Sequence, residues 1–451
     1  MSKPNSTTGT TGPSSPTASI NTNSTAGRIP GRRLLHSPGP THIPDAVLHA
    51  MAVQPMDLAD PRVDETIAAC EDGLRRVLGT RDAQVFMYSA NGHGAWEAVL
   101  VNIAAAGQTV LMAGTGHFSE AWALQAEDLG VVVQRTPWEE GQPIDPGSIE
   151  AALRSDVARA IVAVLVVHTD TASGITSDVP AIRAAIDASG HPALLVVDGV
   201  ASVAAAPLYM DAWGANVVLG ASQKGLMVPP GLAYVAADAR ALAVAQANPM
   251  PRHYWAWQLR VGAMSYRKFC GTPPETLLFG LRAALGLIEQ EGLEAVWARH
   301  ARLAAAVHAA VEGWRGVSDG GGAASGGAGG AASGGAVGSA SNSTGGATAL
   351  GVIDFFCTVP AARSVSVTAI TLGGGHSTDA LRQVARERFQ VAVAGGLGPL
   401  AGRVFRIGHL GDLNEAMLLG ALGGVQAAMG VLNIPHGDGV GRAIAYLSRS
   451  D

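Results

Sequence analysis

The chain has 451 residues, of which 48% are hydrophobic and 15% charged, so it contains enough apolar material for a large buried core. This composition excludes a wholly disordered protein and a small disulfide-rich scaffold. A net charge of −6 argues against a general nucleic-acid-binding protein, because such proteins usually carry a basic stripe.

The first 33 residues are expected to form a disordered tail. Residues 1–27 are rich in Ser, Thr, Asn and Gly and cannot bury enough apolar surface to offset their chain entropy. An acid-poor, Ser-rich N-terminus is also typical of a mitochondrial transit peptide, but the few basic residues here have no amphipathic period. We therefore expect a cytoplasmic protein, with mitochondrial targeting as the alternative.

Neither a membrane segment nor a metal site is expected. The sequence has no run of about 18 consecutive apolar residues, which a membrane-spanning helix would need. The three cysteines are scattered and lack metal-ligand spacing, so they indicate ordinary thiols in a reducing compartment.

From residue 46 onward, helix-like segments alternate with short apolar runs. Such runs of β-branched residues, without polar alternation, fit strands that are buried on both faces. Repeated strand–helix–strand units predict an α/β domain with a mostly parallel sheet covered by helices, which we place at residues 34–273. The expected helices are 63–78, 94–105, 118–129 and 179–188, and the expected strands are 85–88, 109–112, 131–134, 160–167, 193–197 and 217–219.

A smaller C-terminal α+β domain is expected over residues 274–451. Residues 320–347 interrupt it and are almost entirely Gly, Ala and Ser without charge, which is typical of a flexible surface insertion. The expected helices of this domain are 277–291, 293–314, 377–389 and 414–429, and the expected strands are 364–371, 390–394 and 404–407.

A lysine and an aspartate follow two of the expected strands of the large domain. Lys224 comes shortly after the run at 217–219, where poor hydration would disfavour its charged form and make the amine nucleophilic. Taken alone, a surface lysine is the simpler interpretation. Asp198 ends the run at 194–197, and a buried carboxylate is costly unless a cation pairs with it. A Schiff-base lysine and an aspartate facing a pyridinium nitrogen are the pair that pyridoxal phosphate enzymes need.

Three further segments could complete such a site. Residues 89–94 join a strand to a helix, and their backbone N–H groups could bind a phosphate, although a tight turn with an N-cap explains them too. Thr171 could donate a hydrogen bond to a phenolate oxygen, or belong to an ordinary hydroxyl-rich turn. Arg406 lies in an apolar strand and needs an acidic partner, either a substrate carboxylate or an internal salt bridge.

These motifs in this order resemble the class V aminotransferases, and within them the serine–glyoxylate and alanine–glyoxylate types. The resemblance runs from about residue 34 to residue 447. No single motif identifies the family, but the ordered set is highly specific. The matching segments are 37–40, 89–97, 168–174, 197–202, 222–231, 252–257, 395–398 and 406–411.

The resemblance implies a fold-type I pyridoxal phosphate enzyme that acts as a homodimer with its sites at the subunit interface. By this resemblance, Lys224 corresponds to the Schiff-base lysine, Asp198 to the partner of the ring nitrogen and Arg406 to the arginine that binds the substrate carboxylate. The other cofactor-binding residues that it implies are Asn91, Gly92, His93, Phe118, Thr171, Val200, Gln223 and Thr272.

Two of these implied roles concern specific contacts. Phe118 stands where the family stacks an aromatic side chain on the cofactor ring. Thr272 matches a residue that reaches the phosphate bound by the other subunit. Relatives usually place a Tyr shortly before that Thr, whereas this chain has Phe269, Cys270 and Gly271 there.

The expected reaction is a ping-pong transamination from serine or alanine to glyoxylate, which yields glycine and a 2-oxo acid. A cysteine desulfurase is one alternative, but it needs a nucleophilic cysteine on a mobile loop, and Cys357 lies in an apolar run. A pyridoxamine–pyruvate aminotransferase is another, although that family has an acidic residue where Asn91 stands. A binding scaffold that kept the fold without activity is the third, and intact Lys224 and Asp198 argue against it.

Overall fold

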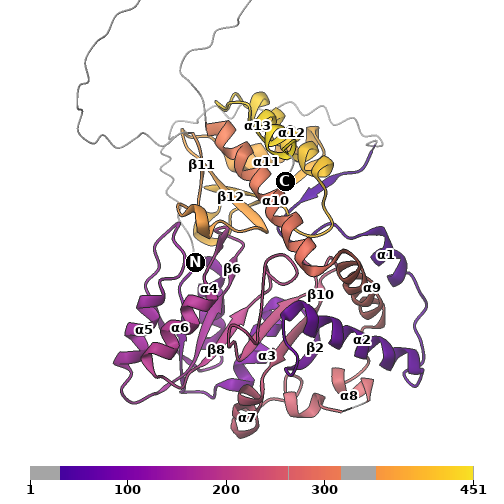
Figure 1. Cartoon of the computed structure of the whole chain (residues 1–451), viewed down its shortest axis with the longest axis vertical. Helices are drawn as coiled ribbons and strands as arrows, with labels where there is room; N and C mark the ends of the chain where they lie inside the picture. The colour runs from indigo at the N-terminus through magenta and orange to yellow at the C-terminus, as the bar shows by residue number, and fades with distance from the viewer. Residues whose placement is uncertain (1–30, 263, 316–351, 450–451) are drawn as a thin grey trace, which may run out of the picture. The chain divides into compact units, whose positions relative to one another are not determined.

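The computed structural model describes residues 31–262, 264–315 and 352–449 (Figure 1). The chain divides into a unit at Met1–Arg32 and a unit at Arg33–Asp451, and all elements below belong to the second. The insertion expected at 320–347 and nearly all of the expected N-terminal tail lie outside the described residues. The division into domains at 273/274 stays a prediction.

The larger sheet has seven strands in the order β2-β10-β9-β8-β5-β3-β4. All neighbouring strands are parallel except at β10, which is antiparallel to both β9 and β2. The expected α/β fold with a mostly parallel sheet is therefore confirmed. The strands are β2 (Gln84–Ala90), β3 (Thr109–Met112), β4 (Val132–Arg135), β5 (Ile161–Val167), β8 (Leu194–Asp198), β9 (Val217–Ala221) and β10 (Gly231–Ala237).

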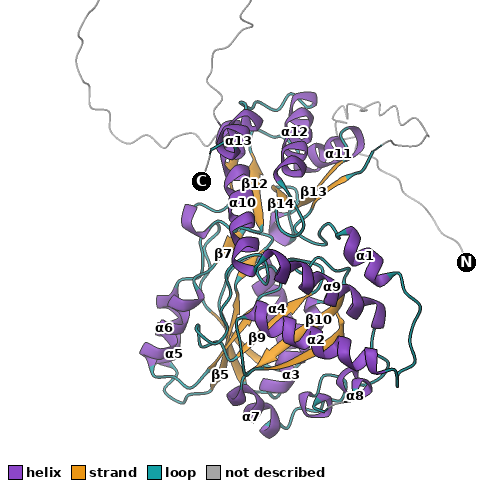
Figure 2. Ribbon diagram, turned by 45° about the vertical axis from the view of Figure 1, so that its right-hand side comes forward, coloured by secondary structure: helices purple, strands orange, loops and turns teal. Residues whose placement is uncertain are grey.

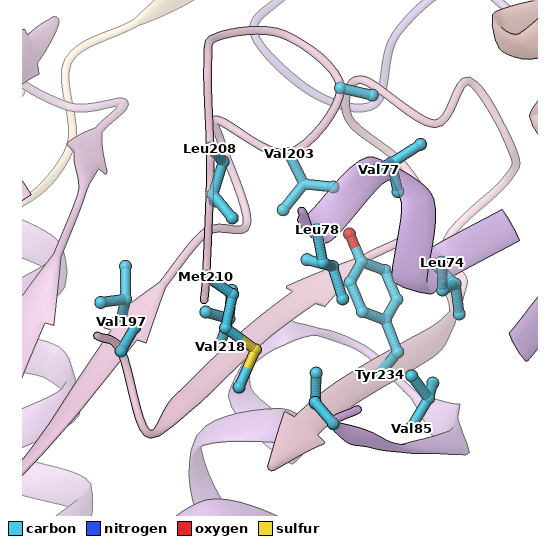
Figure 3. Packing of buried hydrophobic residues seen from close by; sticks show 14 of the residues in the cluster. Leu74, Val77, Leu78, Val85, Val197, Val203, Leu208, Met210, Val218 and Tyr234 are labelled. Atoms are coloured by element: carbon cyan, nitrogen blue, oxygen red, sulfur yellow. The ribbon is translucent and has the colours of Figure 1, made fainter. Parts of the chain in front are cut away.

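This sheet is buried on both faces because successive residues of its strands enter different hydrophobic clusters. In β5, Val164 and Val166 face one cluster while Leu165 and Val167 face the other. The first cluster is completed by α2 (Pro61–Leu78), α5 (Pro146–Ser155), α6 (Val179–Ser189) and α9 (Glu275–Glu291). The second is completed by α3 (Gly92–Ile103), α4 (His117–Asp128) and α7 (Ala239–Ala247). Figure 3 shows part of the first cluster, where Leu74 and Leu78 of α2 lie beside Tyr234 of β10.

Several helices begin at side-chain caps that the sequence supplies. Asp60, Asp145, Asp178 and Asp238 each accept a hydrogen bond from a backbone N–H group in the first turn of the helix that follows. Such caps satisfy N–H groups that have no partner within the helix. They fix the residue at which each helix begins.

The second sheet has five strands in the order β1-β13-β14-β12-β11. These are β1 (Leu34–His36), β11 (Ile353–Phe355), β12 (Val367–Leu372), β13 (Val391–Gly395) and β14 (Val404–Gly408). The helices α10 (Leu293–Arg315), α11 (Thr378–Arg388), α12 (Glu415–Val431) and α13 (Gly439–Leu447) pack with it in a third cluster. Val296 near the start of α10 belongs to the core of the larger sheet, so this helix joins the two cores (Figures 1 and 2).

β1 comes early in the chain but pairs in parallel with β13, far later in the sequence. The following residues therefore lead from the smaller sheet back towards the larger one. The remaining elements are α1 (Asp45–Met51), β6 (Thr169–Asp170), β7 (Ile175–Thr176) and α8 (Ser265–Phe269). Within the described ranges, no helix has the length and apolar character needed to cross a membrane.

Candidate active site

A cavity of about 250 Å³ lies at the carboxyl end of the parallel strands of the larger sheet. This edge is where open α/β sheets bind their ligands, because the loops after successive strands converge there. Of the residues that the sequence places at a cofactor site, nine line it: Asn91, Gly92, His93, Phe118, Thr171, Asp198, Val200, Gln223 and Lys224.

Lys224 enters the cavity from the loop that follows β9. Its Nζ donates a hydrogen bond to the carbonyl oxygen of Pro38 at 2.7 Å, and the hydroxyl of Thr41 donates to the Lys224 carbonyl oxygen at 3.0 Å. The segment after β1 therefore contacts both the side-chain amine and the backbone carbonyl group of Lys224. Burial, reinforced by the nearby charge of Arg406, lowers the pKa of the Lys224 amine to about 8. A minor fraction of this amine, far larger than for an exposed lysine, is therefore neutral and nucleophilic near neutral pH.

Gly39 leaves the space that the lysine side chain occupies. Its φ is +143°, and a Cβ atom built on it would lie 2.5 Å from Cδ, Cε and Nζ of Lys224. Real Cβ atoms do not come that close to other heavy atoms. The close approach of Lys224 therefore explains why residue 39, in the matching segment 37–40, is a glycine.

Asp198 is the last residue of β8 and is 4% exposed. One carboxylate oxygen accepts a hydrogen bond from the indole N–H of Trp96 at 2.8 Å, and the other from the backbone N–H of Val200 at 2.7 Å. Burial raises the pKa of this carboxyl to about 6, although both hydrogen bonds favour its charged form. A cationic N–H group placed in the cavity would relieve the cost of burying this charge.

The N-terminus of α3 forms a cradle for an anion at another part of the cavity wall. Asn91 caps the helix, and its Oδ1 accepts from the backbone N–H of Gly94 at 3.2 Å. The N–H groups of Gly92 and His93 belong to the first turn, which has no acceptors within the helix. Beside them, Gln223 also lines the cavity, and the NH₂ group of its side-chain amide is a hydrogen-bond donor. These groups fit a phosphate, whose oxygens would take the free N–H groups.

Arg406 lies on β14 of the smaller sheet and is 5% exposed. Its Nη1 donates to the carbonyl oxygen of Thr171 at 2.7 Å and its Nε to that of Gly395 at 2.7 Å. In the part of the chain that the structure describes, it forms no ion pair, so the internal salt bridge considered for it is not present. Burial lowers the pKa of this guanidinium to about 10. Arg406 does not line the cavity itself, but contacts the Thr171 turn that does.

Thr272 does not line the cavity of its own chain. It is exposed, in the loop between α8 and α9, while Phe269 just before it is buried in the core. Its expected contact with the partner's phosphate stays a prediction.

Cys357 also lies away from the cavity that holds Lys224. It is buried, its Sγ donates a hydrogen bond to the Val359 carbonyl oxygen at 3.3 Å, and burial raises the pKa of its thiol. A thiol in this setting is a poor nucleophile.

Trp96 and Asp170 contribute to the site, but the sequence analysis gave neither a role there. Trp96 stacks on Trp122, and its N–H group also binds Asp198. No sequence signal distinguishes it from the other buried residues of α3. Asp170 lies in the same hydroxyl-rich turn as Thr171, and its carboxylate organises that turn.

Comparisons with known proteins agree with this geometry. The family model for class V aminotransferases matches residues 33–318, more than half of the chain. The serine–glyoxylate aminotransferase of Methylorubrum extorquens is 38% identical over 431 residues, which covers 94% of this chain and 98% of that protein. The L-aspartate–glyoxylate aminotransferase of Paracoccus denitrificans is 36% identical over 413 residues, covering 90% and 94%.

The fold is also that of solved aminotransferases. The crystal structure of ureidoglycine–glyoxylate aminotransferase from Bacillus subtilis matches with a TM-score of 0.79 at 23% identity, over 94% of this chain and 100% of that one. At this level of identity the match bears on the fold alone.

The donor set of the cavity fits pyridoxal phosphate. A partly neutral amine suits the aldehyde, the Asp198 carboxylate suits the ring nitrogen, and the α3 N-terminus with the side-chain NH₂ of Gln223 suits the phosphate. With the family match and the relatives above, the conclusion is that this chain belongs to the class V aminotransferases and is a pyridoxal phosphate-dependent enzyme.

Proposed function

We propose that this enzyme transfers the amino group of a small amino acid, serine or alanine, to glyoxylate by a ping-pong mechanism. The products would be glycine and the 2-oxo acid of the donor. The observation that carries the proposal is the arrangement of Lys224 and Asp198 around one cavity, with Arg406 held against its wall through Thr171. The relative at 38% identity, a serine–glyoxylate aminotransferase, supports this choice of substrates.

Lys224 is the residue that would move the proton. Pyridoxal phosphate, when bound, supplies a protonated ring that withdraws electrons from the α-carbon of the amino acid. An amine with a pKa of about 8 can take a proton from that carbon and return it nearby, since its two protonation states lie close in energy at neutral pH. The hydrogen bond to the Pro38 carbonyl oxygen orients the amine within the cavity.

Asp198 would bind the cofactor and Arg406 would bind the amino acid donor, and neither residue would transfer a proton. Asp198 would hold a positive ring nitrogen, and the N–H of Trp96 orients its carboxylate. Arg406 has a guanidinium without a carboxylate partner among the described residues, so it is available to the carboxylate that every amino acid donor carries. Its hydrogen bonds to Thr171 and Gly395 fix the direction of the planar group. Holding the donor in one orientation lowers the entropic part of the barrier.

The charges around the cavity favour a donor with a single carboxylate. Among the described residues, Lys224 is the only lysine or arginine that lines it, and Arg406, behind the Thr171 turn, is the cation expected to bind the α-carboxylate. A second carboxylate, as in aspartate, would find no further Lys or Arg of this chain in the lining. We therefore expect serine or alanine to be preferred over aspartate, even though one relative at 36% identity is an L-aspartate–glyoxylate aminotransferase.

A panel of amino donors tests this proposal directly. Glyoxylate is the acceptor, pyridoxal phosphate is added, and glycine formation is measured with serine, alanine, aspartate and cysteine as donors. We expect serine to give the highest kcat/KM, with alanine next. A higher kcat/KM for aspartate, or sulfide release from cysteine without glycine formation, would contradict the proposal.

A second subunit is part of this proposal. Large apolar side chains are exposed close to Thr272 in the sequence: Leu259 at 44%, Val261 at 56%, Met264 at 60% and Tyr266 at 53%. An exposed group of this kind is typical of a surface that binds another protein. We infer that this face contacts a second copy of the chain and brings Thr272 to the partner's phosphate site.

A further inference from the structure

The Asp170 carboxylate is fully buried beside the cavity, and neither the family resemblance nor the mechanism above uses it. It is 0% exposed and lies at the end of β6. Among the described residues it has no ion-pair partner, and burial raises the pKa of its carboxyl. A buried carboxylate without a cation is costly unless hydrogen bonds satisfy both oxygens. Both oxygens of Asp170 are satisfied, and by two different segments.

The first of these segments carries Phe118. Oδ2 of Asp170 accepts a hydrogen bond from the backbone N–H of Phe118 at 3.0 Å, in the first turn of α4. The same helix start has a cap of its own, because Ser119 Oγ accepts from the N–H groups of Thr115 and Gly116 at 2.9 and 3.2 Å. Asp170 is therefore not needed simply to begin α4. It fixes the backbone of the residue whose ring lines the cavity.

The second segment carries Thr171. Oδ1 of Asp170 accepts from the N–H groups of Ala172 at 2.8 Å and Ser173 at 3.3 Å, which closes the turn over residues 170–174. The side chain of Thr171 lines the cavity, and its carbonyl oxygen accepts the hydrogen bond from Arg406. The turn is also packed tightly, since a Cβ atom on Gly174 would lie 3.0 Å from the backbone nitrogen of Ala369 in β12.

We propose that Asp170 is a positioning residue that links the cofactor-binding and substrate-binding parts of the site. One of its oxygens holds Phe118, and the other holds the Thr171 turn, which Arg406 contacts. The proposal rests on the function proposed above, since Arg406 is its carboxylate-binding group. Asparagine cannot replace the carboxylate, because its amide has only one acceptor oxygen and would turn an NH₂ group towards one of the two sets of N–H donors.

The test compares Asp170→Asn with Asp238→Asn. Asp238 is a suitable control because its carboxylate also accepts with both oxygens, from the N–H of Ala241 at 2.7 Å and the side chain of Asn216 at 2.8 Å, and it caps α7 away from the cavity. Both variants should lose thermal stability. The Kd of pyridoxal phosphate for the apoenzyme, measured without any donor, and the KM and kcat for the donor are then determined well below both melting temperatures.

We expect D170N to weaken cofactor binding by about fivefold or more, and to raise the donor KM by more than it lowers kcat. D238N should leave Kd and KM within about twofold of the wild type. Wild-type Kd and KM in D170N, or equal losses in D238N, would overturn the proposal. Because Kd is measured without donor, this result does not depend on whether serine, alanine or another amino acid is the natural substrate.

If D170N does not fold, hydrogen exchange of the wild-type protein tests the proposed link instead. Adding pyridoxal phosphate to the apoenzyme should then slow the amides of Phe118, Ala172 and Ser173 together, since one carboxylate binds all three. Slowing of Phe118 with unchanged exchange at Ala172 and Ser173 would overturn the proposed link.

Discussion

The position of the Lys224 amine depends on a glycine that is far away in the sequence. The turn containing Gly39 follows β1 of the smaller sheet, and the lysine chain occupies the space where a Cβ atom would be. The hydrogen bond from Nζ to the neighbouring Pro38 carbonyl oxygen uses the same close approach. A side chain at residue 39 must therefore move the lysine or distort the turn.

We predict that Gly39→Ala slows the capture of pyridoxal phosphate by about tenfold or more and lowers stability by about 1 kcal/mol, because φ is strongly positive and the contact is too short. Stopped-flow absorbance and thermal melting measure the two effects. Gly292→Ala is the matched control, since Gly292 also has a positive φ, of +90°, but no atom lies within 4 Å of its Cβ position. A similar slowing in G292A would show that backbone strain, rather than contact with Lys224, is responsible.

At the scale of secondary-structure elements, the sequence predicted six of the seven strands of the larger sheet to within two residues at each end, but it did not predict β10. β3 is observed at the expected residues, and β8 is shifted by one residue so that it includes Asp198. Uninterrupted apolar runs identify such strands because both faces of the sheet are buried. The residues at and after their carboxyl ends could therefore be assigned to one edge, and nine of the expected site residues do line one cavity there.

The order of the strands could not be obtained in the same way. One apolar run resembles another, so nothing local indicates that β10 lies between β2 and β9, or that β1 pairs with β13. The roles of Trp96 and Asp170 depend on contacts with residues distant in sequence, and both residues occur in segments that look ordinary on their own. Whether Arg406 forms an internal salt bridge likewise depends on contacts that the sequence does not reveal, and the structure shows hydrogen bonds to backbone carbonyl oxygens instead.

At the scale of the whole molecule, we propose that two copies of the chain form the enzyme. We predict that the protein sediments as a dimer and that Val261→Asp weakens this dimer and also the binding of pyridoxal phosphate, because Thr272 lies on the same segment. Val157→Asp is the control, since Val157 is 89% exposed but lies elsewhere, before β5. A monomeric wild-type protein that binds the cofactor normally would contradict the proposed contact, as would equal effects of V157D.

The composition of the chain allows the binding of the cofactor by Lys224 to be measured directly. The sequence contains only three lysines, Lys3, Lys224 and Lys268, and Lys268 is paired with Glu71 at 2.7 Å. The measurement is borohydride reduction of the loaded enzyme followed by peptide mapping, with Lys224→Arg and Lys268→Arg as matched variants that keep the charge but lose the amine. We predict that the label lies on Lys224 alone and that K224R, but not K268R, loses both the label and the visible absorbance of the bound cofactor. Label on Lys3 or Lys268, or an unchanged spectrum in K224R, would contradict the account.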